Sequence, residues 1–216
     1  MTAPVTVALG TWSWFSGPDG RSFLSEEDPS DREAPMLTFD DIVARGRAST
    51  EEALALFDSL DPIPVDFMIG TWRGDEITTG HPLDGLLTAT GWYGKQFIDA
   101  DTVHPLLFHT ADRNAAFPVD PARVPMRVPL PTGRGQSYHR LITAARPLLA
   151  TTKPTARLRM TEYRGRSSAT MIYDAKPIND IFRKVSDDTV LGLMDRRGDD
   201  RPCPFVLRRA TIRLVG

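Results

Sequence analysis

The segment Gly70-Thr71-Trp72-Arg73-Gly74 closes an apolar stretch that begins at Val65. A tryptophan is large enough to plug one end of a closed antiparallel barrel, and a glycine on each side lets the backbone bend and lets another segment pass close by. The stretch from Val65 to Arg73 also has the pattern of a strand, so we interpret it as the opening strand of such a barrel. The motif concerns the fold and names no substrate.

The last third of the chain has the clearest strand pattern. Apolar and polar residues alternate over 157–161 and over 168–173, and a turn around Gly165 separates the two runs, which is typical of a β-hairpin. Further strands are expected over 189–196 and over 205 to about 214. Short strands at regular spacing predict a mainly β fold with short helices, a closed antiparallel lipocalin-like β-barrel of about seven to nine strands.

The chain divides into an arm and a single barrel domain. Residues 1–36 combine turn formers and acidic side chains with Trp12 and Trp14 and show no sustained period. We expect an extended arm whose indoles pack on the body or on a second copy in a homodimer. The domain, 37–216, contains in order a helical pair over 37–61, the first strands over 65–110, a proline-rich excursion over 112–154 and the C-terminal strands over 156–214.

Two short amphipathic helices are expected in the helical pair. Thr38 can cap the first helix, and Ser49 with Glu52 three residues later has the spacing of a capping box for the second. The sequence leaves two places for them. They form either a lid across the barrel mouth, which we favour, or a layer on the outer wall.

The composition of the chain excludes several classes of function. The chain has 216 residues, 41% of them hydrophobic, and a formal charge of −2, so it has no basic surplus for binding nucleic acid. No apolar run approaches the roughly 20 residues that cross a bilayer, and residues 1–9 lack the Lys or Arg of a secretory signal. We expect a cytoplasmic protein with neither nucleic-acid nor membrane partners. Cys203, the single cysteine, is interpreted as incidental.

Four ordered segments carry a resemblance to a known family. They are GTWRG at 70–74, HPLDG at 81–85, GWYGK at 91–95, and ATMIYD at 169–174 with PIND at 177–180. Together they resemble the bacterial GXWXG-motif family with its companion C-terminal domain of unknown function. The resemblance covers roughly residues 38–209. It implies a lipocalin-like barrel and little agreed biochemistry.

Two features of the sequence argue against haem binding. The haem-binding nitrobindin group has a similar barrel and the pattern Gly-x-Trp-x-Gly-x-Gly, but Glu76 stands here in place of the third glycine. That family's iron ligand is a histidine near the C-terminus, whereas no histidine follows His139. The spacing of His104 and His109 suits neither a helical nor a strand metal site. We therefore expect no cofactor and no metal.

His81 and Lys95 are the first candidate catalytic residues. An imidazole exchanges protons near neutral pH, and His81 precedes a short helix expected around 83–87. The alternative is that His81 only caps its own turn. Lys95 shares strand parity with Tyr93 and Phe97, so it is expected to point inward, where loss of solvent would make it a base or a Schiff-base nucleophile. The alternative is a solvated lysine.

Three aspartates are further candidates for the functional site. Asp174 and Asp180 flank a turn at one rim of the barrel and are expected to orient the proton-transfer residues, with Asp174 included among the catalytic candidates. Asp195 shares parity with Leu191 and Leu193, so we expect it in the interior. A buried carboxylate needs a partner, and Arg183 or Lys95 could supply it.

The expected ligand site is lined by aromatic and polar side chains. Its members are Trp72, Trp92, Tyr93, Tyr173, Asp180, Arg183 and Asp195. This mixture suits a small hydrophobic or partly polar organic molecule. Two functions stay open: a cofactor-independent enzyme doing acid–base chemistry, such as isomerisation, cyclisation, elimination or hydration, and a carrier or sensor that leaves its ligand unchanged. A third class, a structural module, would require a filled barrel.

Overall fold

The computed structural model describes residues 12–16, 22–26, 37–124 and 138–216. The chain forms two units, Met1–Met36 and Leu37–Gly216, and each is described by itself. In the first unit, β1 (Trp12–Ser16) pairs antiparallel with β2 (Ser22–Glu26). The expected extended arm therefore contains a hairpin. The rest of the arm and residues 125–137 of the proline-rich excursion lie outside the described residues.

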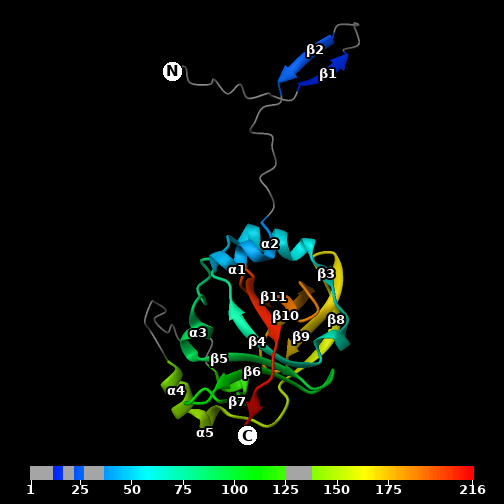
Figure 1. Ribbon diagram of the computed structural model, residues 1–216. Coiled ribbons are helices and arrows are strands. Elements are labelled where there is room, and N and C mark those ends of the chain that lie inside the picture. The colour runs from blue at the N-terminus through cyan, green and yellow to red at the C-terminus, as the bar shows by residue number, and fades with distance from the viewer. Residues whose placement is uncertain (1–11, 17–21, 27–36, 125–137) are drawn as a thin grey trace, which may run out of the picture. The chain divides into compact units, whose positions relative to one another are not determined.

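Eight antiparallel strands of the second unit close into a barrel, which confirms the predicted fold (Figure 1). They are β4 (Gly70–Glu76), β5 (Trp92–Phe97), β6 (Val103–His109), β8 (Ala156–Tyr163), β9 (Arg166–Tyr173), β10 (Ile178–Lys184), β11 (Thr189–Arg196) and β12 (Cys203–Arg209). The sheet runs β6-β5-β4-β12-β11-β10-β9-β8. It closes where β6 meets β8, with Val103 opposite Ala156.

Shorter elements extend this barrel. Outside the closed ring, β7 (Ala115–Pro118) pairs with β6 and, in parallel, with β13 (Arg213–Leu214), while β3 (Asp61–Pro62) pairs with β10. The short helices are α3 (Leu86–Thr90), α4 (His139–Ala144) and α5 (Arg146–Leu149), with 3-10 turns η2 (Val65–Met68) and η3 (Pro121–Arg123). The strand expected from Val65 therefore begins only at Gly70, because a 3-10 turn precedes it.

Trp72 holds this turn against the opening strand. Its side chain is buried, and its indole Nε1 donates a hydrogen bond of 2.7 Å to the carbonyl of Met68. The guanidinium of Arg209 lies 4.4 Å from the centre of the indole ring. The indole therefore packs between the η2 turn and Arg209, and its one N–H is already used.

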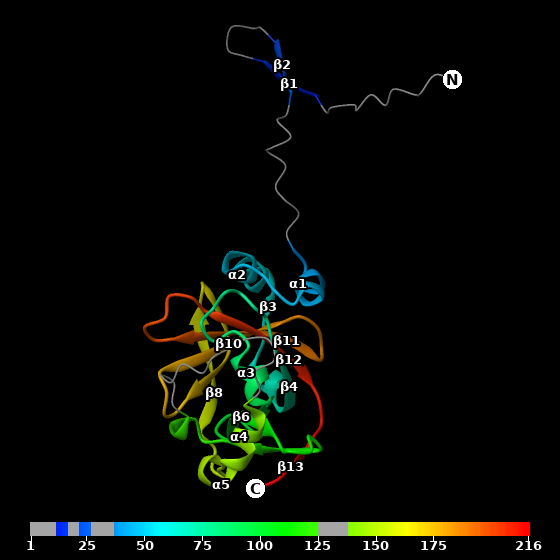
Figure 2. The same cartoon turned by 90° about the vertical axis from the view of Figure 1, so that its left-hand side faces the viewer.

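The helices α1 (Phe39–Arg45) and α2 (Thr50–Ser59) begin with the predicted capping residues. Ile42, Leu56 and Phe57 pack in one cluster with the strand residues Ile181, Leu191, Leu193 and Val206. The residues that alternate with these, such as Phe182 and Leu207, belong to the hydrophobic core inside the barrel, so the helices cover the outer wall (Figures 1 and 2). The favoured expectation of a lid across the mouth was wrong, and the outer-wall alternative is the one observed.

None of the helices in the described ranges combines the length and apolarity needed to cross a bilayer.

Candidate functional site

An ion pair lies inside the barrel. The ammonium Nζ of Lys95 on β5 is 2.8 Å from Oδ2 of Asp180 on β10, and the two side chains are 3% and 2% exposed. Lys95 also donates to the carbonyl of Pro105 at 3.2 Å and to the hydroxyl of Tyr173 at 3.3 Å. Its three N–H groups therefore have three acceptors, each from a different strand.

Three aromatic rings surround the Lys95 ammonium. Its Nζ lies 5.1 Å from the ring centre of Phe205 and 5.6 Å from those of Trp92 and Tyr173, within the range of cation–π attraction. The rings of Trp92 and Phe205 meet edge to face, with their centres 6.2 Å apart. We call Lys95, Asp180, Tyr173, Trp92 and Phe205 the interior cluster.

Two glycines make room for these rings. A Cβ on Gly74, the last residue of the Gly-x-Trp-x-Gly motif, would lie 2.0 Å from the Trp92 ring. A Cβ on Gly192, which is directly opposite Phe205 on β11, would lie 2.3 Å from that ring. The motif therefore shapes the interior cluster through the side chain that Gly74 lacks.

An irregular pairing between β5 and β6 decides which residues of β5 face inward. The register shifts on either side of Gly94, so that Trp92, Lys95 and Phe97 all reach the interior. Tyr93 instead packs with Leu107 and Ala116 in a separate apolar cluster. The expectation that Tyr93 lines the ligand site beside Lys95 was wrong, because simple alternation does not hold through a bulge.

Burial dominates the electrostatics of the interior cluster. It raises the pKa of the Asp180 carboxyl above its ordinary value, although Lys95 and the Tyr173 hydroxyl act in the opposite direction. It raises the pKa of Tyr173 well above its ordinary value, and the Asp180 charge adds to this effect. Tyr173 therefore stays protonated, and Asp180 holds a proton more readily than an exposed aspartate.

Two polar atoms of the interior cluster have no hydrogen-bond partner among the described residues. They are Nε1 of Trp92, a donor, and Oδ1 of Asp180, an acceptor. The Tyr173 hydroxyl lies close enough to the Asp180 carboxylate for a hydrogen bond between them to affect both pKa values, but Oδ1 itself has no partner with hydrogen-bond geometry. Buried polar groups in proteins nearly always have partners, so two unused atoms on side chains that both approach the Lys95 ammonium call for an explanation.

His81 lies outside the interior cluster, in the connection between β4 and β5. Its Nδ1 accepts a hydrogen bond from the backbone N–H of Leu83 at 3.1 Å, so its proton is on Nε2, which lies 3.0 Å from Oδ2 of Asp199. Arg196 donates to the same oxygen at 2.7 Å. Both ring nitrogens are thus engaged, and the histidine fastens its own turn to the connection after β11.

The other predicted polar residues are placed apart from Lys95. Asp174 is half exposed, 3.8 Å from Arg157 at the surface. Asp195 follows Leu191 and Leu193 on the outer face of the wall, so its parity was correct but that face is not the interior. Arg183 is buried under α2, where its guanidinium stacks on Phe57 at 4.8 Å. The expectation that Arg183 or Asp195 lines the interior was wrong.

Cys203 begins β12, and four carboxylates influence its thiol. Burial raises the pKa of Cys203 to about 12, with further contributions from Asp84, Glu76, Asp180 and Asp199. A thiol with this pKa is protonated at neutral pH and unreactive. Among the described residues, no group of three or more His, Cys, Asp or Glu side chains is arranged to hold a metal ion.

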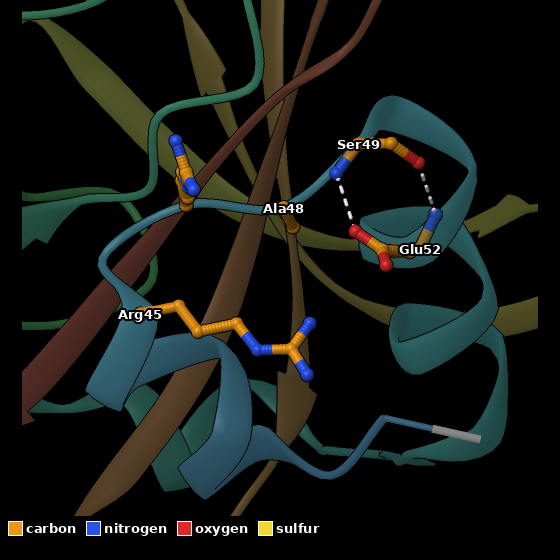
Figure 3. Close-up of a pocket in the computed structure, with 5 residues that line it drawn as sticks. Arg45, Ala48, Ser49 and Glu52 are labelled. Atoms are coloured by element: carbon orange, nitrogen blue, oxygen red, sulfur yellow. Dashed lines mark hydrogen bonds between the residues drawn. The ribbon is translucent and has the colours of Figure 1, made fainter. Parts of the chain in front are cut away.

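Two hollows lie at the surface, away from the interior cluster. One, of about 480 Å³, is lined by Arg45, Arg47, Ala48, Ser49 and Glu52 at the junction of α1 and α2 (Figure 3). Its floor includes the reciprocal capping bonds of Ser49 and Glu52, so this helix N-terminus is already satisfied. The other, of about 520 Å³, lies along 150–155 near Asp120 and Gly216. Aromatic and aliphatic side chains line the interior of the barrel.

Sequence reasoning placed four members of the interior cluster among the candidates and missed Phe205 and the carbonyl of Pro105. Phe205 alternates with Leu207 at the start of the last long strand, which is a usable signal for an inward-facing ring. A backbone carbonyl leaves no signal in a sequence.

The comparisons with known proteins agree with this architecture. A model of the GXWXG protein family matches residues 55–113, and a model of the domain of unknown function DUF4334 matches residues 154–209. A crystal structure of a protein from Thermomonospora curvata is 36% identical, covers 80% of this chain and 95% of that chain, and superposes with a TM-score of 0.59. The comparison with curated proteins found no match.

Proposed function

Since the chain belongs to the family of GXWXG proteins with a C-terminal domain of unknown function, we propose its function from the chemistry of its barrel. The barrel binds a small, partly apolar organic molecule beside Lys95 and Asp180, and this pair performs acid–base chemistry on it. The reaction class is isomerisation, cyclisation, elimination or hydration without a cofactor.

The observation that carries this proposal is the buried ion pair. Replacing a buried ion pair with well-packed apolar residues is often neutral or stabilising, so such a pair is weak evidence for stability. Perturbed pKa values, by contrast, are common at functional sites. The Lys95–Asp180 pair has nearly no exposure, and burial raises the pKa of Asp180. A site arranged in this way serves proton transfer better than it serves folding.

The residues take distinct roles in the proposal. Asp180 accepts a proton from the bound molecule at Oδ1 and returns it at another position, which balances an isomerisation or a cyclisation. In an elimination Asp180 returns the proton to the departing group, and in a hydration it takes one proton from the added water and passes a proton to the molecule. The Lys95 ammonium stabilises the negative charge of the carboxylate. Tyr173, which stays protonated, and the rings of Trp92 and Phe205 exclude water and shape the apolar wall. The predicted roles of His81 and Asp174 are not part of this proposal, because both lie elsewhere.

A carrier or sensor is the second candidate, and one observation favours it. All three N–H groups of Lys95 have acceptors, one of them a backbone carbonyl. A lysine held in this way is poorly placed to form a Schiff base, and the cluster would then orient a ligand without transforming it.

The experiment that tests this proposal replaces both Lys95 and Asp180 with apolar residues. Native mass spectrometry of the purified full chain is expected to show a retained small molecule, and K95M/D180L is expected to stay folded and lose it. The matched control is K184M/D187L, which removes an exposed pair 2.7 Å apart and should retain the molecule. Absence of any adduct in the wild type, or its survival in K95M/D180L, counts against the proposal. Incubating the identified molecule with wild type and D180N separates the enzyme, which converts it, from the carrier.

A further inference from the structure

The two polar atoms of the interior cluster that lack a partner have opposite hydrogen-bonding roles. Trp92 Nε1 can only donate a hydrogen bond, and the carboxylate oxygen Asp180 Oδ1 can only accept one. Both belong to side chains at least nine-tenths buried, and both residues contact the Lys95 ammonium. A single ligand group that satisfies both must accept from the indole and donate to the carboxylate.

The charge of the cluster limits this group further. Lys95 and Asp180 neutralise one another at 2.8 Å, so the interior cluster has no net charge to offer a charged ligand. A carboxylate would meet Asp180, and an ammonium group would meet Lys95. Burying either without a free counter-charge costs several kcal/mol. The ligand is therefore neutral at its buried end.

The walls around the two atoms are aromatic. Trp92, Phe205 and Phe182 meet in successive edge-to-face contacts at 6.2 Å, and the centre of the Tyr173 ring lies 5.6 Å from the Lys95 ammonium. Aromatic and unsaturated carbon fits such edges and faces.

We propose that the ligand of this barrel carries a neutral hydroxyl group on an aromatic or unsaturated carbon skeleton, with the hydroxyl accepting from Trp92 Nε1 and donating to Asp180 Oδ1. The inference rests on the proposed function and names the substrate class of that same site: phenols, enols and allylic alcohols. It excludes carboxylates, amines and plain hydrocarbons as preferred ligands.

A matched set of four probes tests the class: phenol, toluene, benzoate and benzylammonium. The readout is the indole N–H signal of Trp92 in a ¹H–¹⁵N NMR spectrum of the full chain. Trp72 provides an internal control, since its indole N–H is already bonded to Met68. Phenol is expected to shift the Trp92 signal and to bind at least about tenfold more tightly than toluene, a margin typical of hydrogen bonds to buried groups. The two charged probes are expected to leave the signal unchanged.

The variant W92F removes the indole donor and keeps a ring. It is expected to lower the ratio of phenol affinity to toluene affinity about fivefold to tenfold, because only phenol uses the indole donor whereas both probes meet the smaller ring. The four-probe comparison uses only the wild type, so it stands even if W92F does not fold.

The outcomes separate the inference from the proposed function. Equal binding of phenol and toluene, or tighter binding of benzoate or benzylammonium, overturns the inference and leaves a small-molecule barrel in place. If none of the four probes perturbs any residue of the interior cluster, the proposed function fails as well.

Discussion

Gly74 leaves the space that Trp92 fills. The two residues lie on neighbouring strands, and a Cβ on Gly74 would come within 2.0 Å of the indole. The second glycine of the Gly-x-Trp-x-Gly motif is thus tied to the wall of the candidate site and not only to the path of its own strand.

The variant G74A is expected to displace the Trp92 ring and to destabilise the fold by about 1–3 kcal/mol, the usual cost of adding a methyl group to a packed interior. Urea unfolding measures the loss, and near-ultraviolet circular dichroism reports the tryptophan environment. R73A, which trims an adjacent half-exposed side chain, serves as control and should stay within about 0.5 kcal/mol of wild type. A G74A protein as stable as the control, with an unchanged spectrum, would show that the interior has spare room.

Removing only the lysine of the buried pair has a different consequence from removing both partners. K95M leaves Asp180 in the interior without its counter-charge, which is expected to cost about 3–5 kcal/mol at neutral pH. Adding D180L should restore most of that stability. K184M at the exposed pair should cost no more than about 1 kcal/mol. The prediction fails if the double variant is as unstable as K95M, because the cost would then come from lost packing.

The pH dependence of stability has a definite sign at Asp180. Burial raises the pKa of this carboxyl in the folded state, while in the unfolded chain it titrates near about 3.9. The stabilising contribution of the bound proton is therefore complete below that pH and is lost as pH rises through the higher folded-state value. Wild type should lose stability relative to D180N, which cannot ionise, as pH is raised from about 3.5 to 7. A relative gain over that range in urea titrations would mean that attraction to Lys95 outweighs burial.

The sequence allowed the barrel to be predicted because its evidence is local. The alternation over 157–161 and 168–173 and the motif at 70–74 are each visible within a few residues. The same alternation could not say which face of β11 is inside, since both the Leu191 face and the Val190 face are apolar. Asp195 was misplaced for this reason. The outer face of β11 is identified only by the packing of α1 and α2 against it, which is a feature of the tertiary structure.

The candidate site was predicted only in part, again because its arrangement depends on tertiary structure. Lys95 and Asp180 were recognised as candidates, but their pairing depends on closure of the barrel, which brings β5 and β10 to face each other across the interior. Tyr93 was assigned to the wrong side because a bulge at Gly94 leaves no mark in the pattern beyond the glycine itself.

Cys203 is expected to be nearly inert towards alkylation in the folded protein. With the thiol pKa raised to about 12, its thiolate fraction at pH 8 is at least about a thousandfold below that of an exposed cysteine, whose pKa is near 8.5. The rate of reaction with iodoacetamide, followed by mass spectrometry, checks this. The same protein in denaturant is the control and should react at the ordinary rate. Fast modification under native conditions would place the thiol in an electropositive setting that the four carboxylates do not provide.

Phe57 tests whether α2 supports the wall or gates the barrel. The ring is buried against the outer face of the wall, over Arg183 and edge to face with Tyr163. F57A is expected to cost about 3–5 kcal/mol in urea unfolding, while the exposed control V43A on α1 costs under about 0.5 kcal/mol. Because the helices cover the wall and not the mouth, the rate at which phenol exchanges with the interior should be the same in F57A and wild type under conditions where both are folded. An exchange rate that rises in F57A, and not in V43A, would revive the lid that the packing of Ile181 and Leu193 against these helices argues against.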